Sequence, residues 1–284
     1  MMAPARLYRP PPALAGVLRA VVVRDTRGWP LPPAQRLNRY PALPTCCITW
    51  TLAGQSLPLP ADEKPVSALA PVTVSGPQTR PAETTNPGPV HSLMAMFYPD
   101  AFQRMTGVQV VDHVDRACPA HGLLPAPWLD WCRAVAEPGD DAARVARIEE
   151  FIGTQWAGAE APAATPTGLS NLWIDELHHR ARNGHGGRQR SPRQISRLIK
   201  QWTGQSLREL RGWGRAEQAF FEAIRGREDG TLRWNAVALD SGYADQAHLC
   251  RDTLRLTGCS PDALRRGMLS DESFWIYRLW SGAA

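Results

Sequence analysis

The sequence predicts an α+β protein in which a small N-terminal β-barrel or sandwich precedes an all-α C-terminal region. Three observations support this division. Turn residues separate β-branched runs over the first 110 residues, a helical period begins near residue 127, and a helical repeat fills the C-terminal hundred residues. The Ala/Pro-rich stretch 157–167 is the best linker candidate. We therefore expect two domains, residues 1–160 and 168–284.

Four segments of the N-terminal part have the apolar, β-branched composition of strands. They are Leu18–Val23, Cys46–Leu52, Pro71–Ser75 and Pro89–Tyr98. Pro99 then opens a short helix that ends near Gly107. Two amphipathic helical faces follow between residues 127 and 156.

Composition narrows the class of protein. The chain has 43% hydrophobic and 21% charged residues, as folded globular proteins do. No apolar run reaches the roughly 18–20 residues of a membrane span, and the N-terminus lacks an export signal, so we expect a cytoplasmic protein without membrane contact. None of the six cysteines forms a C-x-x-C pair, which favours reduced thiols over a disulfide frame or zinc site.

Positive charge is concentrated in the C-terminal half. Residues 180–215 hold ten basic residues and one acid, Glu209, so this stretch has a net charge of +9. A folded basic segment favours a polyanion partner, because each neutralised phosphate releases counterions. A solvated basic surface without a partner is the alternative.

The C-terminal region contains an internal repeat at an offset of 54 residues. One copy, SPRQISRLIKQWTGQSLREL, begins at Ser191, and the other, DQAHLCRDTLRLTGCSPDAL, begins at Asp245. Five positions are identical and the apolar register is unbroken. The identical pairs are Arg197/Arg251, Thr203/Thr257, Gly204/Gly258, Ser206/Ser260 and Leu210/Leu264.

Each copy has the start and stop signals of a helix. Ser191 and Asp245 are predicted N-caps, and Gly204 and Gly258 are predicted left-handed C-caps. The copies then place polar side chains on an outer face, where Arg and Gln suit guanine and adenine edges. These outer residues are Arg193, Ser196, Arg197 and Lys200 in one copy and Gln246, Cys250 and Arg251 in the other.

The segment WNAVALDSGY, before the second copy, completes a helix-turn-helix pattern. Ala238 allows close helix approach, and Gly242, four residues later, makes the turn. Between the copies, residues 206–225 predict about 30 Å of helix. That length matches two recognition helices placed near one turn of DNA apart, roughly 34 Å.

These motifs resemble the AraC/XylS family of transcription regulators. The Ala-x-x-x-Gly-aromatic, Asp-Gln-x-His and Thr-Gly-x-x-Pro elements carry the resemblance, which covers about residues 170–270. The segment from Ser75 to Gly107 is similar to the N-terminal domain of one subgroup. The resemblance implies a double helix-turn-helix domain and a cupin-like N-terminal domain for effector binding or dimerisation. It places base-reading positions on Arg193, Ser196, Arg197, Gln246, Ala247, Cys250 and Arg251.

The chain departs from that family pattern in two places. Residues 183–190 (NGHGGRQR) are Gly-rich where the first unit needs a leading helix. Two alternatives follow for the first unit. Either residues 173–181 support the first recognition helix in place of a leading helix, or that helix contacts phosphates only. Thr253 stands where the family usually has Phe, which weakens packing.

The remaining polar and aromatic residues are assigned to phosphate contacts, to the core or to an effector pocket. Arg188, Arg190 and Lys200 are predicted phosphate contacts. No catalytic set, cofactor motif or metal site is expected, because the His residues lack partners at ligand spacing. Trp29 and Trp50 are candidates for an effector pocket, with burial in the core as the favoured alternative.

The function predicted from the sequence is sequence-specific binding of double-stranded DNA for transcriptional control, with no enzymatic activity. The reading helices are expected near residues 191–203 and 245–256. Expected partners are a small-molecule effector in the N-terminal domain, RNA polymerase and a second copy of the chain. Two rival hypotheses are a protein-interaction adaptor with a degenerate helix-turn-helix, and an enzyme in the N-terminal domain.

Overall fold

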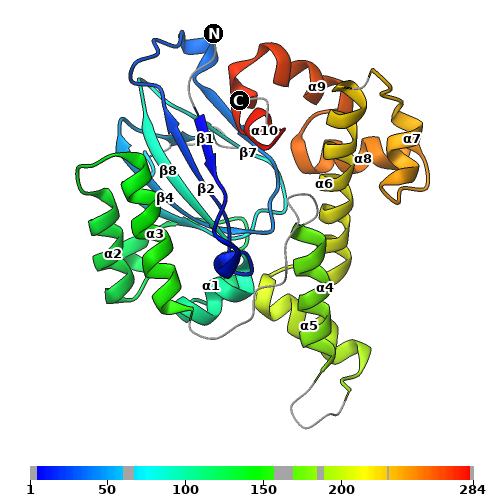
Figure 1. The fold of residues 1–284 in the computed structure, drawn as a ribbon, viewed down its shortest axis with the longest axis horizontal. Helices are drawn as coiled ribbons and strands as arrows, with labels where there is room; N and C mark the ends of the chain where they lie inside the picture. The colour runs from blue at the N-terminus through cyan, green and yellow to red at the C-terminus, as the bar shows by residue number, and fades with distance from the viewer. Residues whose placement is uncertain (1–4, 60–66, 157–168, 184–188, 229, 282–284) are drawn as a thin grey trace.

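The fold combines two antiparallel sheets with a C-terminal set of helices (Figure 1). The computed structural model describes residues 5–59, 67–156, 169–183, 189–228 and 230–281. Its larger sheet has the order β1-β2-β8-β4-β6-β9 and its smaller sheet the order β3-β7-β5. The α+β class is confirmed; the predicted linker, 157–167, lies outside the described residues.

The four predicted strands are confirmed and form the centre of the larger sheet. They are β2 (Leu18–Asp25), β4 (Cys46–Ala53), β6 (Val72–Ser75) and β8 (His91–Phe97). Sequence analysis missed the short strands β1 (Ala5–Tyr8), β3 (Leu37–Tyr40), β5 (Leu57–Pro58), β7 (Ala82–Thr85) and β9 (Ala117–Pro119). Strands this short carry too few alternating residues for a period to show.

One face of the larger sheet is buried under N-terminal helices. The helices are α1 (Pro99–Thr106), α2 (Ala126–Ala136) and α3 (Asp141–Gln155), with short 3-10 turns at 12–14, 33–35, 110–113 (η3) and 120–122. Trp50 of β4 is fully buried there, in edge contact with Trp131, and its indole N–H donates to the carbonyl of Cys132 at 3.0 Å. Trp50 is therefore a core residue, and the favoured interpretation of burial in the core is confirmed over that of a pocket residue.

The other face of the larger sheet lines a partly open cavity of about 610 Å³. Strand alternation sends Cys47, Thr49 and Thr51 of β4 toward this cavity, while their neighbours in sequence point to the helices. The smaller sheet supplies the opposite wall, including Asn38 and Tyr40. Trp29 does not line it.

The C-terminal half of the described chain is helical, and no described helix is both long and apolar enough to cross a bilayer. Its helices are α4 (Leu169–Arg182), α5 (Pro192–Thr203), α6 (Leu207–Glu228), α7 (Trp234–Asp240), α8 (Gln246–Thr257), α9 (Pro261–Ser270), the 3-10 turn η5 (Glu272–Phe274) and α10 (Trp275–Ser281). Figure 1 shows α4 and α5 near one end of α6, and α7, α8 and α9 near the other.

The last helical segment returns to the N-terminal sheets. Glu272 of η5 accepts from Arg24 of β2 at 2.9 Å and from Arg278 of α10 at 2.8 Å, and all three side chains are buried. Burial lowers the pKa of Arg24, and the Glu272 carboxylate opposes that shift. The indole N–H of Trp275 donates to Asn38 at 2.9 Å, beside the cavity. The C-terminal segment thus closes part of the N-terminal fold.

Removing the Glu272 carboxylate is expected to destabilise the protein strongly. Glu272→Ala leaves two buried guanidinium groups without their shared carboxylate, and breaking such a buried network costs about 3–5 kcal/mol. Asp130→Ala is the control, because the Asp130–Arg133 pair is exposed and such pairs contribute less than about 1 kcal/mol. Urea unfolding measures both; equal losses in the two variants contradict the assignment.

Candidate nucleic-acid interface

The first copy of the repeat forms α5 with the predicted caps. Ser191 and Gln194 make a capping box, in which the Ser191 N–H donates to Gln194 Oε1 at 2.9 Å. Gly204 ends the helix with a φ of +72°, a left-handed conformation that Gly adopts without strain. Both boundaries therefore follow from local side-chain chemistry.

The second copy forms α8 by the same rules. Asp245 caps it by accepting from the His248 N–H at 2.6 Å, and Gly258 ends it with a φ of +73°. The threonine before each terminal glycine makes the same hydroxyl hydrogen bond in both copies. Thr203 donates to the Ile199 carbonyl at 2.8 Å, and Thr257 donates to the Thr253 carbonyl at 2.8 Å. The sequence repeat is therefore a structural repeat.

The predicted reading residues lie on the outer faces of these helices. Seven of the eight are exposed: Arg193, Ser196, Arg197 and Lys200 on α5, and Gln246, Ala247 and Arg251 on α8. Cys250 is half-buried. On the inner faces, Ile199 is fully buried and Leu249 and Leu256 are nearly so.

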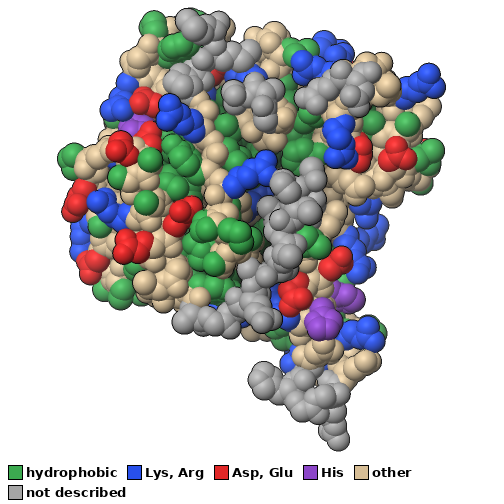
Figure 2. Space-filling model, viewed as in Figure 1, with side chains coloured by type: hydrophobic (Ala, Val, Ile, Leu, Met, Phe, Trp, Pro, Cys, Tyr) green, Lys and Arg blue, Asp and Glu red, His purple; other side chains and the backbone are tan. Residues whose placement is uncertain are grey.

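The four cations of this set are not neutralised by described carboxylates. Among the residues the structure describes, no ion pair involves Arg193, Arg197, Lys200 or Arg251. Arg255, also on α8, does pair with Asp252 at 3.3 Å. The cations at the predicted positions are thus available to an external anion. Figure 2 shows Lys and Arg side chains over the C-terminal helices on one face of the molecule.

The second unit has a complete helix-turn-helix. Val237 and Ala238 of α7 are buried, and Gly242 makes the turn with a φ of +76°. Tyr243 is buried next to it, in edge contact with His248 at 5.1 Å. Burial raises the pKa of the Tyr243 phenol, so the hydroxyl stays protonated. His248 is half-buried and packs against this ring.

The first unit is built differently. Asn183 and Gln189 form an isolated bridge between α4 and α5, while residues 184–188 lie outside the described residues. Arg190 donates to the carbonyls of Ala181 at 3.1 Å and Asn183 at 3.0 Å, at the end of α4. These carbonyls occupy one guanidinium nitrogen of Arg190, Nη1, so the phosphate contact of Arg190 stays a prediction; Arg188 lies among the residues not described.

Helix α4 packs on α5 and joins it to the N-terminal domain. Ala181 and Leu177 of α4 and Ile199 of α5 belong to one buried cluster. Asp100 of α1 accepts from the Trp173 indole at 2.8 Å and also pairs with Arg180. Sequence reasoning missed Asp100, since nothing in its local sequence signals a partner on a distant helix.

Helix α6 separates the two units. Its 22 residues correspond to about 33 Å at 1.5 Å per residue. Ser206 caps it, and Glu209 accepts from the Ser206 N–H at 2.7 Å, as the capping-box pattern predicts. Trp213 donates to the carbonyl of Ala42 at 3.0 Å, and Glu217 pairs with Arg19 of β2, so the N-terminal domain holds the middle of the helix.

The described residues contain no group of three His, Cys, Asp or Glu side chains placed to hold a metal ion. His91 contacts Asp141 at 2.9 Å. The six cysteines are free thiols, and burial raises the pKa of Cys47 to about 11 and of Cys132 to about 12.

Residues 189–267 match a protein family described as a helix-turn-helix domain. No curated protein matches the chain.

Crystal structures of ToxT from Vibrio cholerae are weakly similar to the chain. An apo variant has a TM-score of 0.42 and 10% identity, covering 85% of this chain and 95% of ToxT. ToxT bound to (E)-4-(8-methylnaphthalen-1-yl)but-3-enoic acid gives 0.39 and 11%, covering 98% and 100%. ToxT bound to an unsaturated fatty acid gives 0.36 and 11%, covering 86% and 93%. Similarity of this degree supports no conclusion about function.

Backbone conformation predicts opposite effects on the free energy of unfolding for Gly→Ala substitutions at Gly242, in the turn of the second unit, and at Gly153, inside α3. Gly242→Ala should destabilise the protein by about 1–2 kcal/mol, because the left-handed conformation strains a Cβ even where space is free. Gly153→Ala, inside α3 and facing open space, should stabilise by about 0.5–1 kcal/mol. Thermal unfolding compares them; a Gly242→Ala protein as stable as the wild type contradicts the assigned turn.

Proposed function

We propose that this chain, whose residues 189–267 form a helix-turn-helix domain of the AraC type, controls transcription by binding specific sites on double-stranded DNA. One observation carries the proposal. Two copies of one structural repeat present unpaired cations, Arg197 and Arg251, at the same position of two capped helices. A polyanion with a periodic surface is the partner that such a pair of faces fits.

The residues divide into two roles in this proposal. Lys200 contacts phosphates, and Arg193 and Arg197 contact base edges, together with Gln246 and Arg251 of the second unit. Phosphate contacts give affinity that falls with salt, whereas bidentate contacts to base edges give sequence discrimination. Ser196, Ala247 and Cys250 complete the two faces. We propose no catalytic step.

The N-terminal domain, residues 1–160 in our division, is proposed to bind a small-molecule effector. The cavity of about 610 Å³ lies between its two sheets, with hydroxyl groups from Thr49, Thr51 and Thr73 among its lining residues. Thr257 and Gly258, at the end of α8, also line it. An effector placed there would touch the terminus of a reading helix in the domain at residues 168–284.

We also propose a cytoplasmic homodimer that contacts RNA polymerase, as transcription regulators of this kind do. The rival candidate, a protein-interaction adaptor, is favoured by the atypical first unit, in which α4 supports α5 directly. Salt-sensitive binding to duplex DNA would exclude an adaptor without DNA contacts.

Substitution of Arg251 tests the proposal. Arg251→Ala should weaken binding to a genomic DNA fragment by roughly 5- to 150-fold, the loss expected for one bidentate base contact of about 1–3 kcal/mol. Footprinting and a binding titration measure the effect, with circular dichroism to confirm the fold.

Arg255→Ala is the matched control on the same helix. Arg255 is already paired with Asp252, so its loss should change binding much less. Equal binding by Arg251→Ala and wild type would argue against α8 as a reading helix. Absence of duplex binding by the wild type would refute the DNA-binding function itself.

A further inference from the structure

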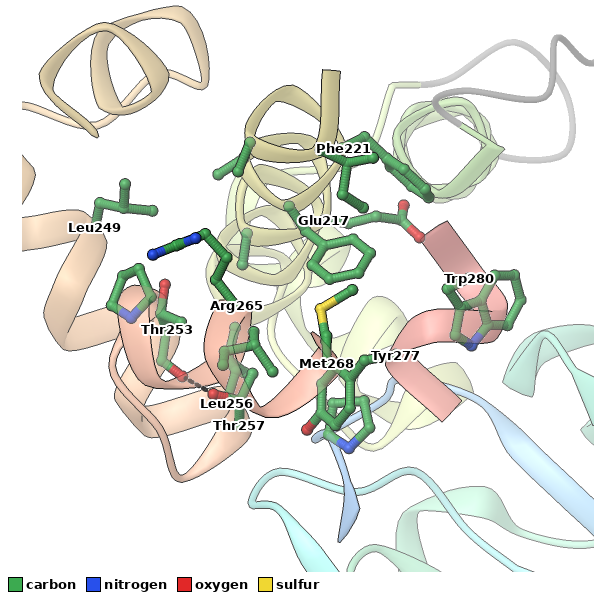
Figure 3. Close-up of a pocket in the computed structure, with 18 of the residues that line it drawn as sticks. Glu217, Phe221, Leu249, Thr253, Leu256, Thr257, Arg265, Met268, Tyr277 and Trp280 are labelled. Atoms are coloured by element: carbon green, nitrogen blue, oxygen red, sulfur yellow. Dashed lines mark hydrogen bonds between the residues drawn. The ribbon is translucent and has the colours of Figure 1, made fainter. Parts of the chain in front are cut away.

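A second, smaller cavity lies between the C-terminal helices and residues 19 and 41–43 of the N-terminal part. Its volume is about 130 Å³, and α6, α8, α9 and α10 surround it (Figure 3). Much of its wall is closed to solvent: Leu249 is 2% exposed, Leu264 6% and Met268 7%. Figure 3 shows Phe221 of α6, Leu249 and Thr253 of α8 and Met268 of α9 among the side chains that bound it. Other lining residues, among them Phe221 and Thr253, are half-buried, so the cavity is a packing gap that opens toward solvent on one side.

The internal repeat explains why the gap exists. At an offset of 54, Thr253 of α8 corresponds to Ile199 of α5, and Leu256 corresponds to Trp202. Ile199 is fully buried and fills its site in the first unit. The inner face of α8 thus has smaller side chains at two of the positions where α5 has large ones, and Thr253 and Leu256 both line the cavity.

The chemistry of the lining is apolar and aromatic. Trp213, Phe220, Trp234 and Tyr277 contribute rings, and Met268 contributes a polarisable thioether. Aromatic rings and methionine sulfur both make favourable contacts with a further ring. These residues favour an aromatic occupant over an aliphatic one.

The charged groups at this cavity are mostly engaged with protein partners. Arg19 pairs with Glu217, and its guanidinium lies 4.6 Å from the centre of the Trp213 ring and 4.7 Å from that of the Trp280 ring. Arg265 lies 3.6 Å from Asp262. An anionic ligand would have to break such pairs. The remaining charged lining residue, Arg227, is exposed, so solvent screens its charge and an uncharged molecule fits the apolar wall better.

We propose that this cavity is a binding site for a small uncharged aromatic molecule with a single ring. An apolar cavity of about 150 Å³ lined by Leu, Ile and Phe binds benzene, so the volume suits an occupant of that size. The occupant restores the contacts that Thr253 and Leu256 leave unmade, and so it stabilises α8.

Binding at this site has a consequence for DNA, and that part rests on the proposed function. The inner face of α8 forms a wall of the cavity, while Arg251 projects from the outer face. An occupied cavity fixes α8 against α6 and α9, which lowers the cost of ordering the helix on DNA.

The experiment uses the full chain with benzene as the probe. Benzene should raise the thermal midpoint of the wild type in a saturable manner, because a ligand that binds only the folded state stabilises it. Thr253→Ile places the side chain of the first copy in the gap. This variant should unfold at a higher temperature than the wild type and should lose the response to benzene.

Two further variants keep the test decisive. Leu254→Ile is the control, since Leu254 is on the same helix, is 55% exposed and does not line the cavity; it should respond like the wild type. Thr253→Val keeps the side-chain size and removes the hydroxyl, so it should retain or increase the response even if Thr253→Ile does not fold. A response that does not saturate, or one that persists in Thr253→Ile, would overturn the site.

A DNA titration separates this inference from the proposed function. With a genomic fragment bound by the wild type, benzene should increase affinity in the wild type and in Leu254→Ile, and should have no effect in Thr253→Ile. Saturable binding of benzene without a change in DNA affinity would overturn the link to α8. Benzene binding by a protein that binds no duplex would instead refute the proposed function.

Discussion

The geometry of the C-terminal half depends on one continuous helix. Helix α6 runs for 22 residues, about 33 Å, which is close to the roughly 34 Å of one turn of DNA. Because a helix resists bending over this length, it fixes the separation of the two repeat copies. The N-terminal domain holds the same helix through the Arg19–Glu217 pair and the Trp213–Ala42 hydrogen bond. The spacing of the two repeat copies and the attachment of the N-terminal domain therefore depend on one element.

The N-terminal domain contacts both units beyond α6. Asp100 binds α4, which supports α5, and the Ala42 N–H donates to the Leu256 carbonyl of α8 at 2.7 Å. The C-terminal segment returns to the sheets through Glu272 and Trp275. Each helix-turn-helix unit thus contacts the N-terminal domain, whose two sheets enclose the cavity of about 610 Å³. The effector that we propose would act on such an arrangement by favouring one packing of these contacts over another.

Local signals in the sequence predicted a large part of this structure. The caps of α5 and α8 follow from Ser191, Asp245 and the terminal glycines, because cap chemistry involves residues only a few positions apart. The short strands of the smaller sheet were missed, because their pairing is set by partners distant in sequence. The hydrogen bonds of Arg190 to carbonyls at the end of another helix were missed for the same reason. The base-contact residues stay predictions; all of them except the half-buried Cys250 are exposed as expected.

The central claim is that two helices, held at a fixed distance, read neighbouring turns of the major groove. Binding to an operator with inserted base pairs tests it directly. Adding about half a turn, roughly 5 base pairs, between the two protected segments turns one of them to the opposite face of the duplex. The account predicts a loss of affinity of at least about tenfold, the equivalent of one good base contact, and a footprint reduced to one segment. Unchanged affinity with both segments still protected would contradict a rigid spacing between α5 and α8.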